Sequence, residues 1–143
     1  MTDLIEVKTA DLAGEALGWA VAKAERLDVH VAKPHYGAPA RVFVNYRGEA
    51  TERCERYNPQ ESWALGGPLK IKHQIGDGPA LGGWTAYPSR PNEPTDWLMG
   101  PSPLVEICRA VITKITSNTV QVPKELMPRA LLPKYSTLAA QAA

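Results

Sequence analysis

The sequence predicts an α+β domain, in which a small and mostly antiparallel sheet of about four short strands packs with two main helices. Two segments, residues 9–26 and 102–116, repeat apolar residues at intervals of three and four, the period of an amphipathic helix. Other short segments alternate apolar and polar residues, the period of a strand. The 143 residues suffice for one such domain, with a core that folds without a metal or a disulfide.

The first main helix is expected over residues 9–26. Thr9 is a suitable N-cap, and Asp11 places a negative charge in the first turn, where the helix dipole favours it. The frequent alanines favour the helical state. One face carries Leu12, Ala16, Trp19, Ala20 and Lys23.

Four strands are expected, over residues 27–33, 40–46, 83–87 and 119–122. In the first two, valines alternate with polar neighbours, and the turn-like connector between them predicts an antiparallel pair. The third lies within a segment rich in glycine and proline, which we expect to form mainly turns.

A short helix is expected between the second and third strands. Asn58 would cap it, Pro59 would occupy its first position, and Gly66 and Gly67 would end it after about two turns. Pro68 would then open a further short turn.

The second main helix is expected over residues 102–116, with Ser102 as the cap and Pro103 in the first position. Its spacing predicts an unbroken core-facing stripe, formed by Leu104, Ile107, Cys108, Val111, Ile112 and Ile115. Residues 1–123 are therefore expected to form a single domain. Residues 124–143, with two further prolines and an alanine-rich end, are expected to form an extension that is loosely packed or docked on a partner subunit.

Composition excludes several classes of function. A net charge of +1 provides no basic excess for non-specific binding of nucleic acid. No apolar run approaches the length of a membrane helix, and the first residues do not resemble a signal peptide. Cys54 and Cys108 allow one bridge, although two reduced thiols are the better interpretation, and neither they nor the three histidines form a metal motif. No catalytic motif is present, so we expect a protein that is not an enzyme and has no cofactor.

The aromatic residues suggest a binding surface. Four Trp and five Tyr stand against one Phe, a balance typical of surfaces that meet ligands or partners. Trp63 and Trp97 each precede a Gly-Pro unit, which would place an indole beside the free N–H groups of a helix N-terminus. The alternative is a pair of tight turns whose indoles fill the core.

These considerations predict a ligand site in which aromatic rings stack on the ligand and basic side chains pair with its negative charge. Its candidate residues are Tyr57, Trp63, Gly67, Pro68, Lys70, His73, Trp84, Trp97 and Arg109. For the charged members, a solvated helix face or a surface salt bridge is the alternative.

The chain resembles the NinX family of bacteriophage proteins at several segments, in order along the sequence. These are residues 4–22 (LIEVKTADLAGEALGWAVA), 57–69 (YNPQESWALGGPL), 83–84 (GW), 100–109 (GPSPLVEICR) and 120–123 (VQVP). The resemblance implies a phage origin and action in the cytoplasm of the infected bacterium. It implies no reaction.

The function expected from these observations is that of a non-enzymatic phage accessory protein. It would bind a small anionic or nucleotide-like molecule, for example to sequester a signalling nucleotide of host defence. The alternative is a protein-interaction module that inhibits a host or phage protein through its Trp/Pro-rich surface. Neither a membrane nor non-specific nucleic acid is expected as a partner, and a homo-oligomer remains open.

Overall fold

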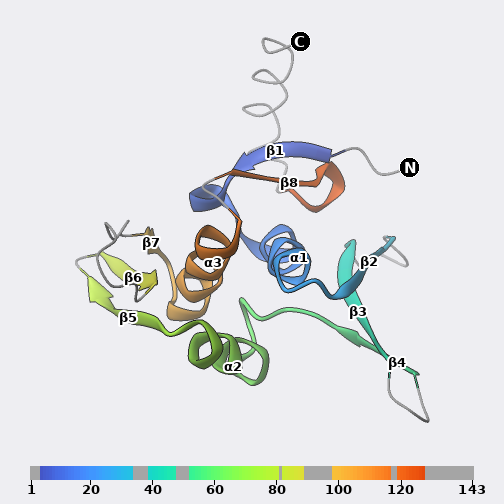
Figure 1. The fold of residues 1–143 in the computed structure, drawn as a ribbon. Coiled ribbons are helices and arrows are strands. Elements are labelled where there is room, and N and C mark those ends of the chain that lie inside the picture. The colour runs from blue at the N-terminus through green and yellow to red at the C-terminus, as the bar shows by residue number, and fades with distance from the viewer. Residues whose placement is uncertain are drawn as a thin grey trace.

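Two helices, α1 (Gly14–Ala24) and α3 (Pro103–Ile115), pack against each other at the centre of the molecule (Figure 1). The computed structural model describes residues 4–33, 39–47, 52–80, 82–88, 98–116 and 119–127. Fully buried apolar side chains of α1, α3 and neighbouring strands form one core, which includes Leu17, Val21, Val44, Ile107 and Ile112. The predicted α+β class is confirmed.

Three small antiparallel sheets surround the helices. The first pairs β1 (Leu4–Lys8) with β8 (Thr119–Pro123). The second has the order β2 (Asp28–Ala32), β3 (Arg41–Arg47), β4 (Glu52–Arg56), and the third the order β5 (Ile75–Ala80), β6 (Gly83–Pro88), β7 (Leu98–Gly100). The four predicted strands correspond to β2, β3, β6 and β8, and the expected β2–β3 pairing is antiparallel. The prediction of a single sheet of about four strands is wrong, because the described residues contain eight strands in three separate sheets.

The first main helix is shorter than expected. Thr9–Asp11 form a 3-10 turn, Leu12 and Ala13 are extended, and α1 begins only at Gly14, whose φ is +58°. The extended residues have a structural role, since the Leu12 carbonyl accepts hydrogen bonds from α3. The second main helix matches its prediction, and the Ser102 side chain caps it by accepting from the Val105 N–H at 3.3 Å.

The short helix is displaced along the chain: α2 spans Trp63–His73 and runs through both glycines and the proline. Instead of capping a helix, Asn58 forms a turn in which its carbonyl accepts the N–H groups of Glu61 and Ser62. Gly66 is there for packing, because a Cβ atom would lie 2.6 Å from Leu104 Cδ2 and 2.8 Å from the Pro59 carbonyl oxygen. Pro68 has no backbone N–H, so one carbonyl group of the preceding turn lacks its helical hydrogen bond. Pro68 lies on the exposed side of α2, where that carbonyl can reach water.

The packed domain extends beyond the expected boundary at Pro123. After β8, Lys124–Leu126 form a 3-10 turn, and Leu126 and Met127 are buried against the core. Residues 128–143 lie outside the described residues, so the expectation for the extension concerns only those positions.

Candidate functional site

Five of the predicted ligand residues lie on α2, which separates them onto two sides. Trp63, Gly67 and Pro68 point outward together with Ala64 and Ile71, and we call these five residues the outer face of α2. The Trp63 side chain is 54% exposed and Ile71 is 79% exposed. Trp63 is therefore not a core residue.

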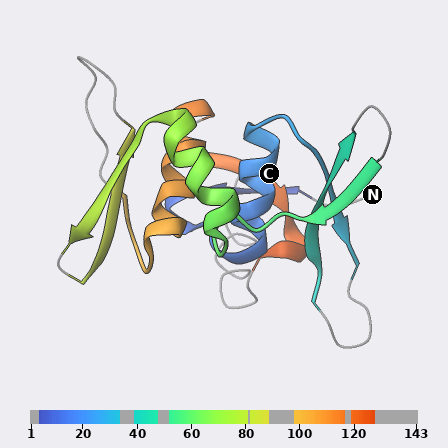
Figure 2. The same ribbon diagram turned by 90° about the horizontal axis from the view of Figure 1, so that it is seen from below.

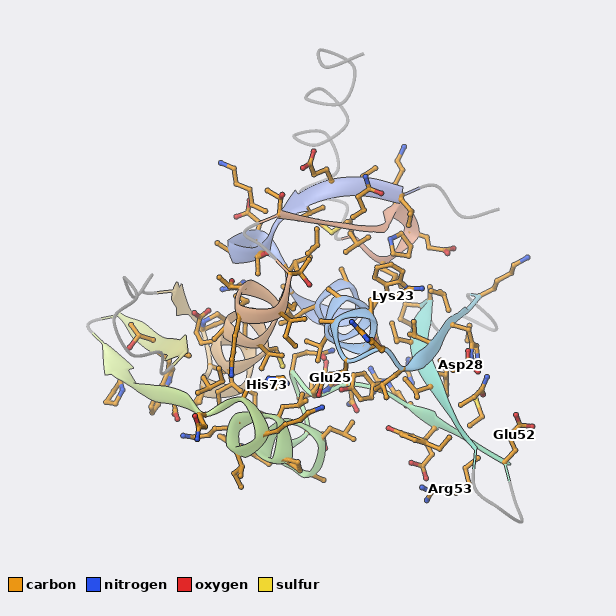
Figure 3. All side chains as sticks on the ribbon, in the orientation of Figure 1. Lys23, Glu25, Asp28, Glu52, Arg53 and His73 are labelled. Atoms are coloured by element: carbon orange, nitrogen blue, oxygen red, sulfur yellow. The ribbon has the colours of Figure 1, made fainter. Side chains whose placement is uncertain are left out.

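The two predicted cations of α2 face the protein instead. Lys70 Nζ donates to the Ile75 carbonyl at 3.2 Å and pairs with Asp77 at 2.7 Å. His73 is buried, and its Nε2 lies 3.1 Å from Glu25 Oε2, beside the end of α1 (Figure 3). These basic side chains, predicted to pair with the ligand, are thus not beside the exposed indole.

Two of the other predicted aromatic residues, Tyr57 and Trp84, form no ring contact with Trp63 in the described part of the chain. Tyr57 is buried in the core, and burial raises the pKa of its hydroxyl far above the usual range. Trp84 is half-buried on β6. Trp97 lies outside the described residues.

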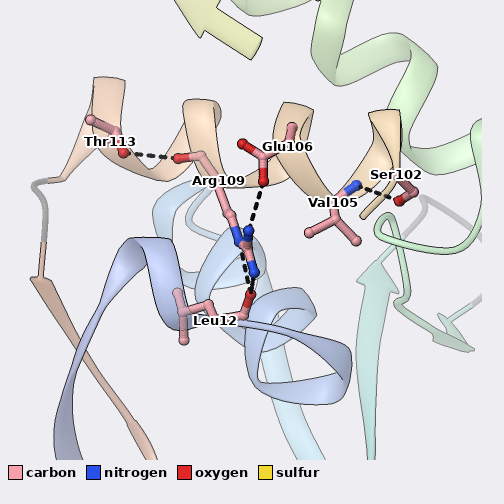
Figure 4. A network of polar contacts seen from close by, with 6 residues as sticks. All are labelled: Leu12, Ser102, Val105, Glu106, Arg109 and Thr113. Carbon is pink, nitrogen blue, oxygen red and sulfur yellow. Dashed lines mark hydrogen bonds and ion pairs between the residues drawn. The ribbon is translucent and has the colours of Figure 1, made fainter. Parts of the chain in front are cut away.

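Arg109, predicted as a ligand contact, is buried in a hydrogen-bond network between α3 and the residues before α1 (Figure 4). Its Nε and Nη2 donate to the Leu12 carbonyl at 2.9 and 2.8 Å, and its Nη1 donates to Glu106 Oε1 at 2.7 Å. Burial raises the pKa of Glu106, and Arg109 opposes that shift. This placement favours a structural role, in a buried ion pair rather than the surface salt bridge weighed from the sequence.

A hollow of about 360 Å³ lies elsewhere, between α1 and the two-stranded β1–β8 ribbon. α1 contributes Trp19, Ala20, Lys23 and Ala24, and the remaining wall consists of Leu4, Thr116, Val120 and Gln121. Its volume falls within the range of about 300–1,000 Å³ that is common for small-molecule sites. Most of the lining side chains are apolar, as in such sites.

Lys23 provides the charge in this hollow. Its Nζ lies 5.4 Å from the centre of the Trp19 ring, a cation–π contact within one turn of α1. The lining contains no acidic side chain, and Lys23 forms no ion pair with any described residue. Figure 3 labels Lys23 on α1. The electrostatics of the hollow therefore favour an anion.

Neither a metal centre nor a membrane span is found in the described part of the chain. No three His, Cys, Asp or Glu side chains there are grouped to hold a metal ion. None of the helices in that part has the length and apolar character that crossing a bilayer requires.

The family model described as Bacteriophage P22, NinX matches residues 8–114, about three-quarters of the sequence. The chain belongs to the NinX family. The resemblance noted in the sequence is thereby confirmed, and with it the link to bacteriophages. A search of curated proteins found no match.

The NinX family model covers only part of the lining of the hollow. It covers Trp19, Lys23 and the rest of α1, whereas Leu4 and the β8 residues Val120 and Gln121 lie beyond its ends. The sequence alone did not indicate this hollow, because no strand was expected where β1 lies and Trp19 shares a predicted helix face with Leu12, Ala16 and Ala20. The usable signal was a Trp and a Lys four residues apart, hence neighbours on one helix face.

Proposed function

We propose that this NinX-family protein binds a small anion with a flat, apolar body in the hollow between α1 and β1–β8. The observation that supports the proposal is the Lys23 ammonium group beside the Trp19 indole, in an apolar hollow without an acidic residue. A nucleotide has the required chemistry, since its base can stack on an aromatic ring and its phosphate can pair with a lysine.

The lining suggests how such a ligand would be held. The flat body would lie against Trp19, Ala20 and Ala24, with Leu4 and Val120 as the opposite wall. The anionic group would pair with Lys23, and Thr116 and Gln121 offer hydrogen bonds. Stacking of one base on an aromatic residue contributes about 1–3 kcal/mol, so the indole would provide much of the affinity.

The biological role that follows is sequestration rather than catalysis. A phage accessory protein acting in the cytoplasm of the infected cell would lower the free concentration of the anion that it binds. A signalling nucleotide of host defence is a ligand of this chemistry.

A titration of the full chain with linear and cyclic nucleotides, followed by calorimetry, tests the proposal. We expect at least one nucleotide to bind saturably. Lys23→Gln should weaken binding by about fivefold, the equivalent of about 1 kcal/mol for a partly exposed ion pair. Lys33→Gln removes another exposed lysine, one outside the hollow, and should leave the affinity unchanged. Equal affinities in all three proteins would contradict the proposed site.

The alternative function, binding of another protein, is favoured by one observation, the exposure of Trp63 and Ile71 on the outer face of α2. Failure of every nucleotide to bind would make this alternative the better explanation.

A further inference from the structure

We infer that the outer face of α2 is the surface through which two copies of this chain associate. This inference does not depend on the ligand proposed for the hollow, because none of the outer-face residues lines it. It rests on the exposure of the face, on its symmetry about Gly67 and on the charges at its two ends.

The outer face consists of apolar residues and glycine over two turns of the helix: Trp63, Ala64, Gly67, Pro68 and Ile71. The opposite side of α2, with Gly66, Leu69 and His73, is buried where the helix packs on α3 and β5. In Figure 2 α2 crosses the front of the molecule, with no other described element drawn over it. Large apolar side chains gathered on an exposed surface are characteristic of protein interfaces.

The order of residue sizes matches an antiparallel pair of helices. Trp63 and Ile71 each lie four residues from Gly67, so the sequence of the face is large, small, large. A two-fold axis at Gly67 would bring Trp63 onto the partner's Ile71 and Ile71 onto the partner's Trp63. Contacts within a two-fold interface are reciprocal in this way.

Gly67 itself has no explanation within one copy. A Cβ atom at this position would have no atom within 4 Å, and its φ is not positive, in contrast to the crowded surroundings of Gly66. Glycine inside a helix costs about 1 kcal/mol relative to alanine. Close approach of a second helix accounts for the absence of a side chain at the crossing point.

The charges also favour the antiparallel arrangement. Glu61 lies just before α2 and Lys72 in its last turn. Each pairs within its own copy, Glu61 with Arg56 at 3.7 Å and Lys72 with Glu25 at 3.1 Å, yet their side chains are still 54% and 63% exposed. An antiparallel pair would bring Glu61 of each copy towards the partner's Lys72, adding two attractive contacts to the ion pairs within each copy. A parallel pair would instead bring like charges together.

Sedimentation of the full chain over a series of concentrations tests the inference. We expect a reversible dimer, and Gly67→Leu should raise its dissociation constant at least tenfold, because the new side chain separates the helices. The monomer has room for that side chain, so it should remain folded. Gly78→Leu is the matched control, since Gly78 also has no atom within 4 Å of a Cβ but lies on β5.

Charge reversal tests the direction of pairing. Glu61→Lys alone and Lys72→Glu alone should each weaken the dimer, and the double variant should restore part of the lost affinity. A wild-type chain that stays monomeric at its highest soluble concentration would overturn the inference, and would leave the outer face to a different protein. A dimer that is unaffected by Gly67→Leu and by both charge reversals would also overturn it.

Discussion

Arg109 connects α3 to the residues that lead into α1. Its guanidinium group supplies two N–H donors to the Leu12 carbonyl and one to Glu106, and all three residues are buried. The sequence showed Arg109 beside an apolar stripe, a position from which the side chain could face a pocket or form a surface salt bridge, the commoner outcome. Only the extended backbone at Leu12, which helix propensity did not predict, shows which carbonyl the guanidinium binds.

We expect Arg109→Met to lower the free energy of unfolding by about 3–5 kcal/mol, because it leaves the Glu106 carboxylate buried without its cation. Urea denaturation measures the loss. Adding Glu106→Gln to Arg109→Met should recover part of the lost stability, since no unpaired charge then remains. A loss below about 1 kcal/mol would show that the network is not important for folding.

The two cysteines should differ sharply in reactivity. Cys54 is exposed, with its Sγ 3.8 Å from His30 Nε2, whereas Cys108 is fully buried. Burial raises the pKa of the Cys108 thiol to about 12, so almost no thiolate forms there at neutral pH. Brief treatment with iodoacetamide should add one group to the native protein and two to the unfolded protein, as measured by intact mass. Two groups added at equal rates under native conditions would contradict the placement of Cys108.

At the scale of helices and strands, the spacing of apolar residues predicted an element correctly where that element buries one continuous apolar stripe. The apolar residues of α3 predicted its extent, and its Ser-Pro start was read correctly. α2 could not be predicted in the same way. Its glycines signal a helix end locally, but contact with Leu104 and Pro59 explains Gly66 within the helix. Leu104 is distant in sequence, and Pro59 lies outside α2.

The strands that the sequence did not indicate are those with little alternation to detect. β4 (ERCER) carries no large apolar residue, and pairing with β3 determines its conformation. β1 has mixed residues near the chain start and becomes a strand by pairing with β8, more than a hundred residues later.

Ile112→Ala tests the placement of α3. Ile112 is fully buried at the centre of the stripe, so the substitution should cost about 2–5 kcal/mol through lost burial and the cavity that it leaves. Ile115→Ala, on the same helix but at a residue that is 41% exposed, is the control and should cost clearly less. Similar losses at both positions in urea denaturation would be inconsistent with the packing described.

At the scale of the whole molecule, the proposed site combines segments from both ends of the chain. Trp19 and Lys23 are visible as a pair in the sequence, but Leu4 and Val120 reach the hollow only through the pairing of β1 with β8. The family resemblance identified the chain correctly. It could not locate the hollow, since long-range strand pairing forms one of its walls.

The chain beyond β8 contributes to the stability of the whole domain. Leu126 and Met127 are 7% and 5% exposed, which places them in the core. Truncation after Pro123 should therefore lower the melting temperature by several degrees more than truncation after Met127. Equal melting temperatures for the two truncated proteins would show that the domain ends at Pro123, as the sequence alone suggested.

The central claim is that the anion binds beside Trp19, and the indole N–H signals of the four tryptophans test it most directly. In NMR spectra recorded during a nucleotide titration, with each signal assigned by substitution of its tryptophan, the Trp19 signal should shift saturably. The Trp63 signal, from the outer face of α2, should shift with protein concentration, because the inferred dimer forms through that face, and should not shift with nucleotide. A nucleotide-dependent shift of Trp63 with Trp19 unchanged would place the site on α2 and contradict the account.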